Sequence, residues 1–271
     1  MTRTPNEHPM TSLQPGMDSP RYDSTRQAWE EIWAGASIEQ ELEAVDYRRA
    51  RRTIERYAAY LNKDDLIVEA GSGLGAVIVR LKQMGYRNVH GLDYAVQALQ
   101  ACHRHFPDMP LAAGDVHALP YADNSIDAYL SFGVLEHFEH GMSPALAEAH
   151  RVLKPGGILI LTIPYPNIVN QLVAWRRKRS GGSVLTDDDF YESTYTRDKL
   201  VGSVRDAGFT ILEAVPTSHS FTLWGLGGPF RAKGYYRTSA LAEAVGGILS
   251  VVLPWAFNFT TLVIARKQAA T

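Results

Sequence analysis

The chain has a single cysteine, Cys102, among its 271 residues, so an internal disulfide framework is excluded. A lone thiol fits a reducing compartment, and we therefore expect a cytoplasmic protein. No apolar run reaches the ~20 residues of a membrane-spanning helix, and the first residues lack the apolar core of a secretion signal. The formal net charge is only −2, which argues against a general nucleic-acid partner.

The composition nevertheless provides for a sizeable core, because 45% of the residues are hydrophobic. A chain of this length suits one large α/β domain with an appended cap. Short apolar runs alternate with helical patterns between residues 62 and 163, which is typical of a mostly parallel sheet covered on both faces by helices. The runs predict strands over 66–70, 88–92, 110–114, 126–132 and 158–163, with helices after the first, second and fourth of them.

The remaining segments divide into a tail, a cap and accessory pieces. Residues 1–20 are rich in Pro, Thr, Ser and Asn and are predicted to be a disordered tail. Residues 21–61 are predicted to form an N-terminal cap of two helices, and 62–271 the main domain. Beyond residue 163 the sequence predicts helices over 168–179 and 197–207, a strand ending at Val215, a long insertion at 216–257 and a final strand at 259–265. Ser143 and Pro144 are predicted to be the N-cap and first residue of the helix ending near 153.

A glycine-rich turn follows the first predicted strand, in the run Val68-Glu69-Ala70-Gly71-Ser72-Gly73-Leu74-Gly75. Residues without a Cβ let the backbone approach a ligand closely. With Ala76, the glycines even satisfy the dinucleotide pattern G-x-G-x-x-A. Glu69 argues against that ligand, because a carboxylate there repels a pyrophosphate but suits an amino group and a sulfonium.

Further motifs follow at strand ends. Asp93 ends the second strand in Gly-Leu-Asp-Tyr, where a carboxylate can accept hydrogen bonds from both hydroxyls of a ribose and Tyr94 can pack beside an adenine. Asp115 and Val116 end the third strand and offer an acceptor and an N–H to an adenine ring. The alternative for Glu69 and Asp93 is that these carboxylates cap the helices that follow them.

Five motifs in order, VEAGSGLG, GLDYA, GDVHALPYADNSID, FGVLEH and LKPGG, make the chain resemble the class I S-adenosylmethionine-dependent methyltransferases, in particular their small-molecule subgroup. The resemblance covers residues 48–163, with a weaker match over 194–215. It implies a Rossmann-like seven-stranded sheet whose last strand is antiparallel, with S-adenosyl-L-methionine as the cofactor. Insertions 164–194 and 216–257 then form a cap over a small-molecule acceptor.

The resemblance also implies which residues hold the cofactor. Glu69, Gly71 and Gly73 line the methionine moiety and the sulfonium, and Ser72 belongs to the same turn. Asp93 binds the ribose, while Phe132 and Gly133 border the methyl group. The remaining cofactor contacts expected from it are Tyr94, Asp115 and Val116.

Three residues are candidates for the chemistry at the acceptor. Methyl transfer to oxygen usually needs a base, and His137 follows the strand end that faces the sulfonium. A His that only fixes this turn is the equally weighted alternative. Tyr165 and His219 are the other candidates to orient an acceptor. The cluster Glu136, His137, Glu139 and His140 lacks a clear further ligand, so a solvated turn is favoured over a metal site.

The accessory segments leave several readings open. The predicted helix 238–253 is apolar nearly all round, which indicates a buried helix, a homodimer contact, a lid or an interfacial surface for a lipid-like acceptor. The basic run 176–179 suits a helix end, an anionic acceptor or lipid headgroups. Residues 29–33, Trp-Glu-Glu-Ile-Trp, are expected to close over the cofactor.

The sequence thus leaves competing hypotheses about function. The first is an O-methyltransferase of a small, largely apolar metabolite, and its closest rival methylates carbon or nitrogen. The second is a non-catalytic S-adenosylmethionine-binding scaffold. The third, a nicotinamide dehydrogenase, is supported only by the glycine spacing.

Overall fold

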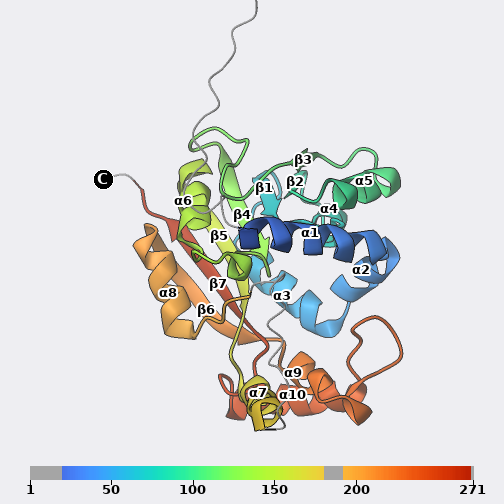
Figure 1. Ribbon diagram of the computed structural model, residues 1–271. Helices are drawn as coiled ribbons and strands as arrows, with labels where there is room; N and C mark the ends of the chain where they lie inside the picture. The colour runs from blue at the N-terminus through green and yellow to red at the C-terminus, as the bar shows by residue number, and fades with distance from the viewer. Residues whose placement is uncertain (1–19, 180–191, 270–271) are drawn as a thin grey trace, which may run out of the picture.

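A computed structural model describes residues 20–179 and 192–269, and its centre is a seven-stranded sheet. The strand order is β3-β2-β1-β4-β5-β7-β6, and only β7 runs antiparallel to its neighbours (Figure 1). This confirms the predicted Rossmann-like sheet with an antiparallel last strand. The strands are β1 (Leu66–Ala70), β2 (Asn88–Asp93), β3 (Leu111–Ala113), β4 (Ile126–Phe132), β5 (Leu153–Pro164), β6 (Phe209–Thr217) and β7 (Thr260–Lys267).

Two hydrophobic layers cover the sheet, one on each face. The first packs α6 (Ser143–Val152) and α8 (Arg197–Asp206) onto one face, while the second packs α3 (Arg48–Ala58) and α4 (Ala76–Gln83) onto the other. The central strands are buried on both faces, which explains why they read as continuous apolar runs rather than as alternating ones. The strand order reverses beside β1, and this is the place where an open parallel sheet leaves a crevice for a ligand.

The N-terminal segment forms three helices where the sequence predicts two, so that prediction is wrong in number. They are α1 (Pro20–Gly35), α2 (Ile38–Val45) and α3. The break between α1 and α2 arises at Ser37, whose Oγ accepts a hydrogen bond from the Gln40 N–H and so caps a new helix. The predicted N-cap of α6 is also displaced by one residue, because Met142 holds that position and Ser143 is already helical.

The connection between β6 and β7 is the predicted insertion, and it is helical. It contains α9 (His219–Gly225), the short 3-10 helix η2 (Gly228–Phe230) and α10 (Ala240–Val252). These elements and α7 (Ile168–Arg179) lie together at one end of the molecule (Figure 1). The insertion therefore stands beside the sheet rather than within it.

Some predictions fall outside the described residues. They are nearly all of the tail 1–20, the Gly181-Gly182 pair, the later part of the insertion 164–194, and the side chains of 176–178. Within residues 20–179 and 192–269, no helix combines the length and the apolarity needed to cross a bilayer.

Candidate functional site

The glycine turn joins β1 to α4 in a backbone conformation that requires glycine. Gly71 and Gly73 have φ angles of 84° and 50°, in the left-handed region that side chains disfavour. A Cβ on Gly71 would lie 2.3 Å from Cγ2 of Val134, and one on Gly73 would lie 2.5 Å from the ring of Trp33. The Gly71 and Ser72 N–H groups donate to the carbonyl of Leu92 at 2.8 and 3.0 Å, which ties the turn to β2.

Asp93 stands beside this turn at the end of β2. Its Oδ2 accepts a 2.7 Å hydrogen bond from the Gly73 N–H, and its Oδ1 accepts a 2.8 Å bond from the Ala95 N–H at the start of α5 (Val96–His105). These bonds brace the turns that lead into α4 and α5, and neither helix has a side-chain cap, so the helix-capping alternative is wrong for Asp93. Each carboxylate oxygen has a second lone pair for a ligand hydroxyl. Burial raises the pKa of Asp93.

Glu69 is the most unusual group of the site. It is only 4% exposed, and its Oε2 is buried without a hydrogen-bond partner among the described residues. Burial first, and then the nearby charge of Asp93, raise the pKa of Glu69 well above its ordinary value. A buried unpartnered acceptor next to another carboxylate is stabilised by a cationic donor, and the amino group of a methionine moiety is one. The residues present therefore fit S-adenosylmethionine.

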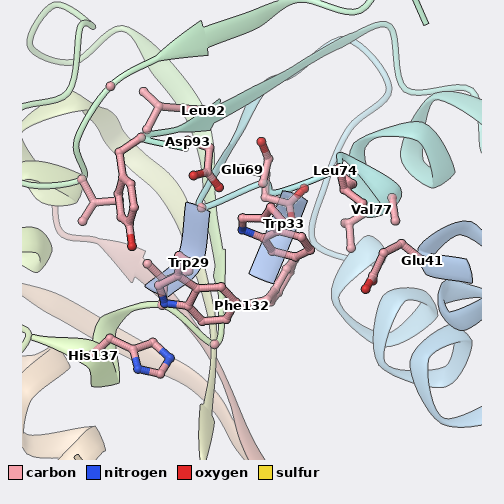
Figure 2. Close-up of a pocket in the computed structure, with 18 of the residues that line it drawn as sticks. Trp29, Trp33, Glu41, Glu69, Leu74, Val77, Leu92, Asp93, Phe132 and His137 are labelled. Atoms are coloured by element: carbon pink, nitrogen blue, oxygen red, sulfur yellow. The ribbon is translucent and has the colours of Figure 1, made fainter. Parts of the chain in front are cut away.

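A cavity of about 230 Å³ lies over these groups, between the strand ends and α1. Figure 2 shows Glu69 and Asp93 on one wall, with Trp33 beside Glu69 and Trp29 toward His137. Trp29 and Trp33 stack with ring centroids 5.6 Å apart. Eight of the ten predicted cofactor residues line the cavity: Glu69, Gly71, Ser72, Asp93, Tyr94, Val116, Phe132 and Gly133.

The structure does not place the other two on the cavity wall. Gly73 is covered by Trp33, and it reaches the site through its bond to Asp93. Asp115 is turned toward His117, whose main-chain N–H and Nδ1 lie 2.7 and 2.8 Å from its Oδ1. The adenine contact expected of Asp115 remains a prediction, and Val116 lines the cavity in its neighbourhood.

Helix α2 also contributes to the cavity, which the sequence did not predict. The prediction covered only residues 29–33, which lie in α1. Glu41 and Val45 line the cavity. Glu41 accepts a 2.8 Å hydrogen bond from the hydroxyl of Tyr235 in the distant insertion, and burial raises its pKa. No signal in the sequence of α2 marks these residues, because their role arises from how the helix docks.

A second, larger cavity of about 570 Å³ continues from the first. The two share Trp29, Gly133 and His137. Five aromatic side chains from α1, the insertion and the residue before β7 contribute to the wall of the second: Trp29, Phe221, Trp224, Tyr236 and Phe259. Asn170 of α7, Glu136, Thr222 and His137 add polar groups. We call it the aromatic cavity.

His137 stands where the two cavities meet, and its neighbour Glu136 lines the aromatic cavity; both belong to the 3-10 helix η1 (Leu135–His137). His137 is 8% exposed, and its ring lies 5.3 Å from that of Trp29. Glu136 is 1% exposed, with Oε2 unpartnered among the described residues. Burial raises the pKa of Glu136 to about 8. The sequence pattern Leu-Glu-His pointed to this turn and to His137, but it gave no sign that the carboxyl group of Glu136 is buried.

The other two predicted candidates for the chemistry lie elsewhere. Tyr165 packs near Trp255, with ring centroids 5.7 Å apart. His219 lies in a groove between α3 and α10, and its Nε2 is 2.7 Å from the carbonyl of Pro254. In the described part of the chain, no three His, Cys, Asp or Glu side chains converge as they would around a metal ion.

Part of the chain is similar in sequence to known methyltransferases. Residues 68–161 match the model of a methyltransferase domain. The chain is 31% identical over 125 residues to malonyl-acyl-carrier-protein O-methyltransferase 1 of Coxiella burnetii, covering 45% of this chain and 42% of that one. It is 30% identical over 165 residues to a ubiquinone/menaquinone biosynthesis C-methyltransferase of Roseobacter denitrificans, covering 53% of this chain and 65% of that one.

The fold agrees over nearly the whole chain with a solved structure. That structure is a Haloferax volcanii methyltransferase in complex with the activator Trm112, at a TM-score of 0.62 and 19% identity, covering 91% of this chain and 97% of that one. The curated relatives, in contrast, are matched over less than two thirds of their own length. The ordered motifs, the match over residues 68–161 and the strand order together identify a methyltransferase domain of the class I S-adenosylmethionine-dependent type within this chain.

Proposed function

We propose that the protein transfers a methyl group from S-adenosylmethionine to an oxygen atom of a small, largely apolar metabolite. In this proposal the cavity over Glu69 and Asp93 holds the cofactor, and we call it the cofactor cavity. The observation that carries the proposal is the aromatic cavity, which meets the cofactor cavity at Trp29, Gly133 and His137. An acceptor bound there lies against aromatic rings at its apolar end and against a few polar groups where the cavities join. The insertion 216–257 and the start of 164–194 supply much of that wall, which supports the predicted acceptor cap.

The cofactor supplies a methyl group on a positively charged sulfur, which a correctly placed nucleophile displaces. The protein contributes alignment of the reactants and exclusion of water. Glu69 binds the amino group in this proposal, Asp93 binds the ribose, and Trp29 with Trp33 covers the site. Phe132 and Gly133 form the wall beside the reacting sulfur.

His137 is the base in this proposal and takes the proton of the acceptor hydroxyl. Glu136 stands next to it with a pKa of about 8, so its carboxyl group is mostly protonated at neutral pH and donates a hydrogen bond. A buried carboxylic acid of this kind orients a carbonyl or hydroxyl oxygen of the acceptor. Tyr165 and His219 remain weaker candidates, because each lies outside the two cavities.

Transfer to carbon is the second candidate, since one relative is a C-methyltransferase by name and another is an O-methyltransferase. Methyl transfer to a nitrogen atom would use an acceptor bound in the same aromatic cavity. The non-catalytic scaffold is the alternative of another class. Turnover separates it from the enzymes, because a scaffold yields no S-adenosylhomocysteine with any acceptor.

The first experiment identifies the product. Purified protein is incubated with methyl-labelled S-adenosylmethionine and a cell extract, and labelled species are found by mass spectrometry. We expect one labelled apolar metabolite whose methyl group is lost under ether- or ester-cleaving conditions. A label retained on carbon would replace the oxygen proposal by the carbon one, and S-adenosylmethionine binding without any labelled product would favour the scaffold.

The second experiment tests His137 with the identified acceptor. His137→Ala should lower kcat by roughly 10²–10⁴-fold, the usual contribution of a general base, with a much smaller effect on cofactor affinity. His140→Ala changes an exposed histidine three residues away and is the control. Unchanged kcat in His137→Ala would leave that residue with a structural role only.

A further inference from the structure

The exposed large apolar side chains of the described residues gather at one end of the molecule. Ten of the twelve belong to α7 or to residues 216–257, and the other two are Ile32 and Val96. The ten are Ile168, Leu172, Trp175, Leu226, Tyr236, Leu241, Ile248, Val251, Val252 and Leu253. Scattered exposed apolar residues are ordinary, whereas such a concentration marks a contact surface.

The packing of α10 fixes which of its sides faces outward. Its buried residues are Ala242 and Gly246, and a Cβ on Gly246 would lie 2.6 Å from the main-chain nitrogen of Ser220 in α9. This close approach leaves the opposite side of the helix open. Ile248 and Val251 lie on that side and are 63% and 79% exposed.

Helix α7 extends the same surface. Ile168, Leu172 and Trp175 follow at the i, i+4 and i+7 spacing of one helix face, and each is 52% exposed. The Ile168 N–H donates a 3.0 Å hydrogen bond to the carbonyl of Ala256, just beyond α10, so the start of α7 is tied to the segment that follows α10. Figure 1 shows α7 and α10 at the same end. We call α7 and α10 together the apolar end.

Positive charge borders the apolar end although the chain as a whole has a net charge of −2. Helix α3 contains five arginines and one glutamate. Arg49, Arg52 and Arg56 line a groove of about 260 Å³ whose opposite wall includes Gly247 and Ser250 of α10. At the end of α7, the Arg179 guanidinium lies 4.8 Å from the ring centre of Trp175.

We propose that the apolar end docks on the surface of an anionic lipid bilayer. The outward side of α10 and the stripe on α7 enter the boundary between headgroups and acyl chains. The exposed Arg52 of α3 contacts lipid phosphates, whereas Arg56 is paired with Glu213 and Arg49 donates to the Tyr236 carbonyl. A second copy of the chain fits less well. A two-fold contact through this face would oppose the same basic elements, because the two patches of such an interface are identical.

Docking in this way brings the aromatic cavity to the bilayer. Asn170 of α7 and Trp224 and Gly225 of α9 line that cavity at the same end. A lipid-dissolved molecule would reach it without crossing water. The docking itself does not depend on methyl transfer, so its test stands apart from that of the proposed function.

The test is cosedimentation of the full-length protein with vesicles of phosphatidylcholine alone or mixed with phosphatidylserine. We expect binding to the mixed vesicles that weakens as salt is raised, and little binding to phosphatidylcholine alone. Ile248→Ser combined with Val251→Ser should lower the partition coefficient by roughly tenfold or more. Val96→Ser, which changes an exposed valine on α5, should leave it unchanged.

A charge reversal tests the arginines separately. Arg52→Glu should weaken binding to the mixed vesicles, and Arg104→Glu on α5 should not. Because the replaced side chains are exposed, circular dichroism should show a retained fold in every variant. Equal binding of wild type to both vesicle types, or no binding to either, would overturn the proposal. So would a concentration-dependent dimer that is lost in the α10 variant, because the apolar end would then bind a second copy.

Discussion

The Gly73 N–H and the Asp93 carboxylate are joined by a 2.7 Å hydrogen bond that ties the glycine turn to the end of β2. The other oxygen of Asp93 accepts from Ala95 at 2.8 Å, so one carboxylate holds the entrances of two helices. The group expected to bind the ribose is therefore also the group that shapes the turn. Binding and stability are coupled at this residue.

Asp93→Ala should lower both properties at once. It leaves two buried N–H groups without their acceptor, which costs about 2 kcal/mol in the free energy of unfolding. Cofactor affinity should fall by roughly a hundredfold, because the ribose contact and the shape of the turn are lost together. Urea unfolding and calorimetric titration with S-adenosylhomocysteine measure the two effects.

Asp115→Ala is the matched control for that variant. Asp115 is also a strand-end carboxylate, but its bonds go to His117 and it lies off the cavity wall. Affinity should fall less than in Asp93→Ala, because at most the expected adenine contact is lost while the glycine turn keeps its bonds to Asp93. If the two variants lose affinity equally, the cofactor makes an adenine contact that reorients Asp115.

Much of the lining of the cavity over Glu69 and Asp93 was predictable, because the sequence encodes it locally. The backbone conformation at Gly71 and Gly73 requires residues without a Cβ, so the turn is visible in the sequence. Parallel strands end at the same edge of the sheet, so carboxylates at the strand ends are expected to lie close together. Eight of the ten predicted cofactor residues accordingly line the cavity. Asp115 shows the limit, since the choice between His117 and a ligand is made by side-chain geometry that no motif records.

The parts that depend on docking between distant segments could not be predicted. Glu41 reaches the cofactor cavity because α2 packs near the insertion, where Tyr235 bonds to it from 194 positions away. The aromatic cavity likewise combines α1, η1, α7 and α9. The apolar sequence of α10 left burial and exposure open, and the contact of Gly246 with Ser220 decides which side is exposed.

Glu69→Gln should separate binding from stability. Burial and the charge of Asp93 raise the pKa of Glu69 in the folded protein. At pH values between the unfolded and the folded pKa, Glu69 is protonated in the folded state and ionised in the unfolded state. The free energy of unfolding therefore falls as the pH rises through this interval. The Gln variant lacks this cost and should be at least as stable as wild type at pH ~8.

The same variant should bind the cofactor more weakly, because glutamine gives no charge to the amino group. Wild-type binding should also release protons, since a cationic partner lowers the pKa of Glu69. Calorimetry in two buffers of different ionisation enthalpy measures that release. Glu55→Gln, at an exposed position of α3, should keep the wild-type release; persistence of the full release in Glu69→Gln would assign it to another group.

Glu136 gives a second, more quantitative pH dependence. Burial raises the pKa of Glu136 in the folded protein to about 8, above the ordinary carboxyl value of 4.5. The folded protein therefore binds one more proton than the unfolded chain between these limits, and its stability falls with rising pH by up to about 1.4 kcal/mol per pH unit. Glu136→Gln lacks this contribution. Its free energy of unfolding, relative to that of wild type, should therefore increase as the pH rises from 4.5 to about 8.

Denaturant unfolding at several pH values between ~5 and ~8 measures that difference. Glu139→Gln replaces an exposed carboxylate three residues away and should give a pH dependence parallel to wild type. A parallel curve for Glu136→Gln as well would mean that Glu136 is ionised in the folded protein at neutral pH. Its role as a hydrogen-bond donor to the acceptor would then be wrong.

Gly73→Ala tests whether α1 closes the cofactor cavity through Trp33. The new Cβ would lie 2.5 Å from the indole ring, in addition to the strain of a φ angle of 50°. Gly85→Ala is the matched control, because its φ angle is 90° and no atom lies within 4 Å of the new Cβ.

Both variants should lose about 1–2 kcal/mol of stability from backbone strain. Only Gly73→Ala should also displace Trp33 from its stack with Trp29, shift the tryptophan fluorescence and weaken cofactor binding by about tenfold or more. Identical fluorescence and affinity in the two variants would show that α1 does not rest on the glycine turn in solution.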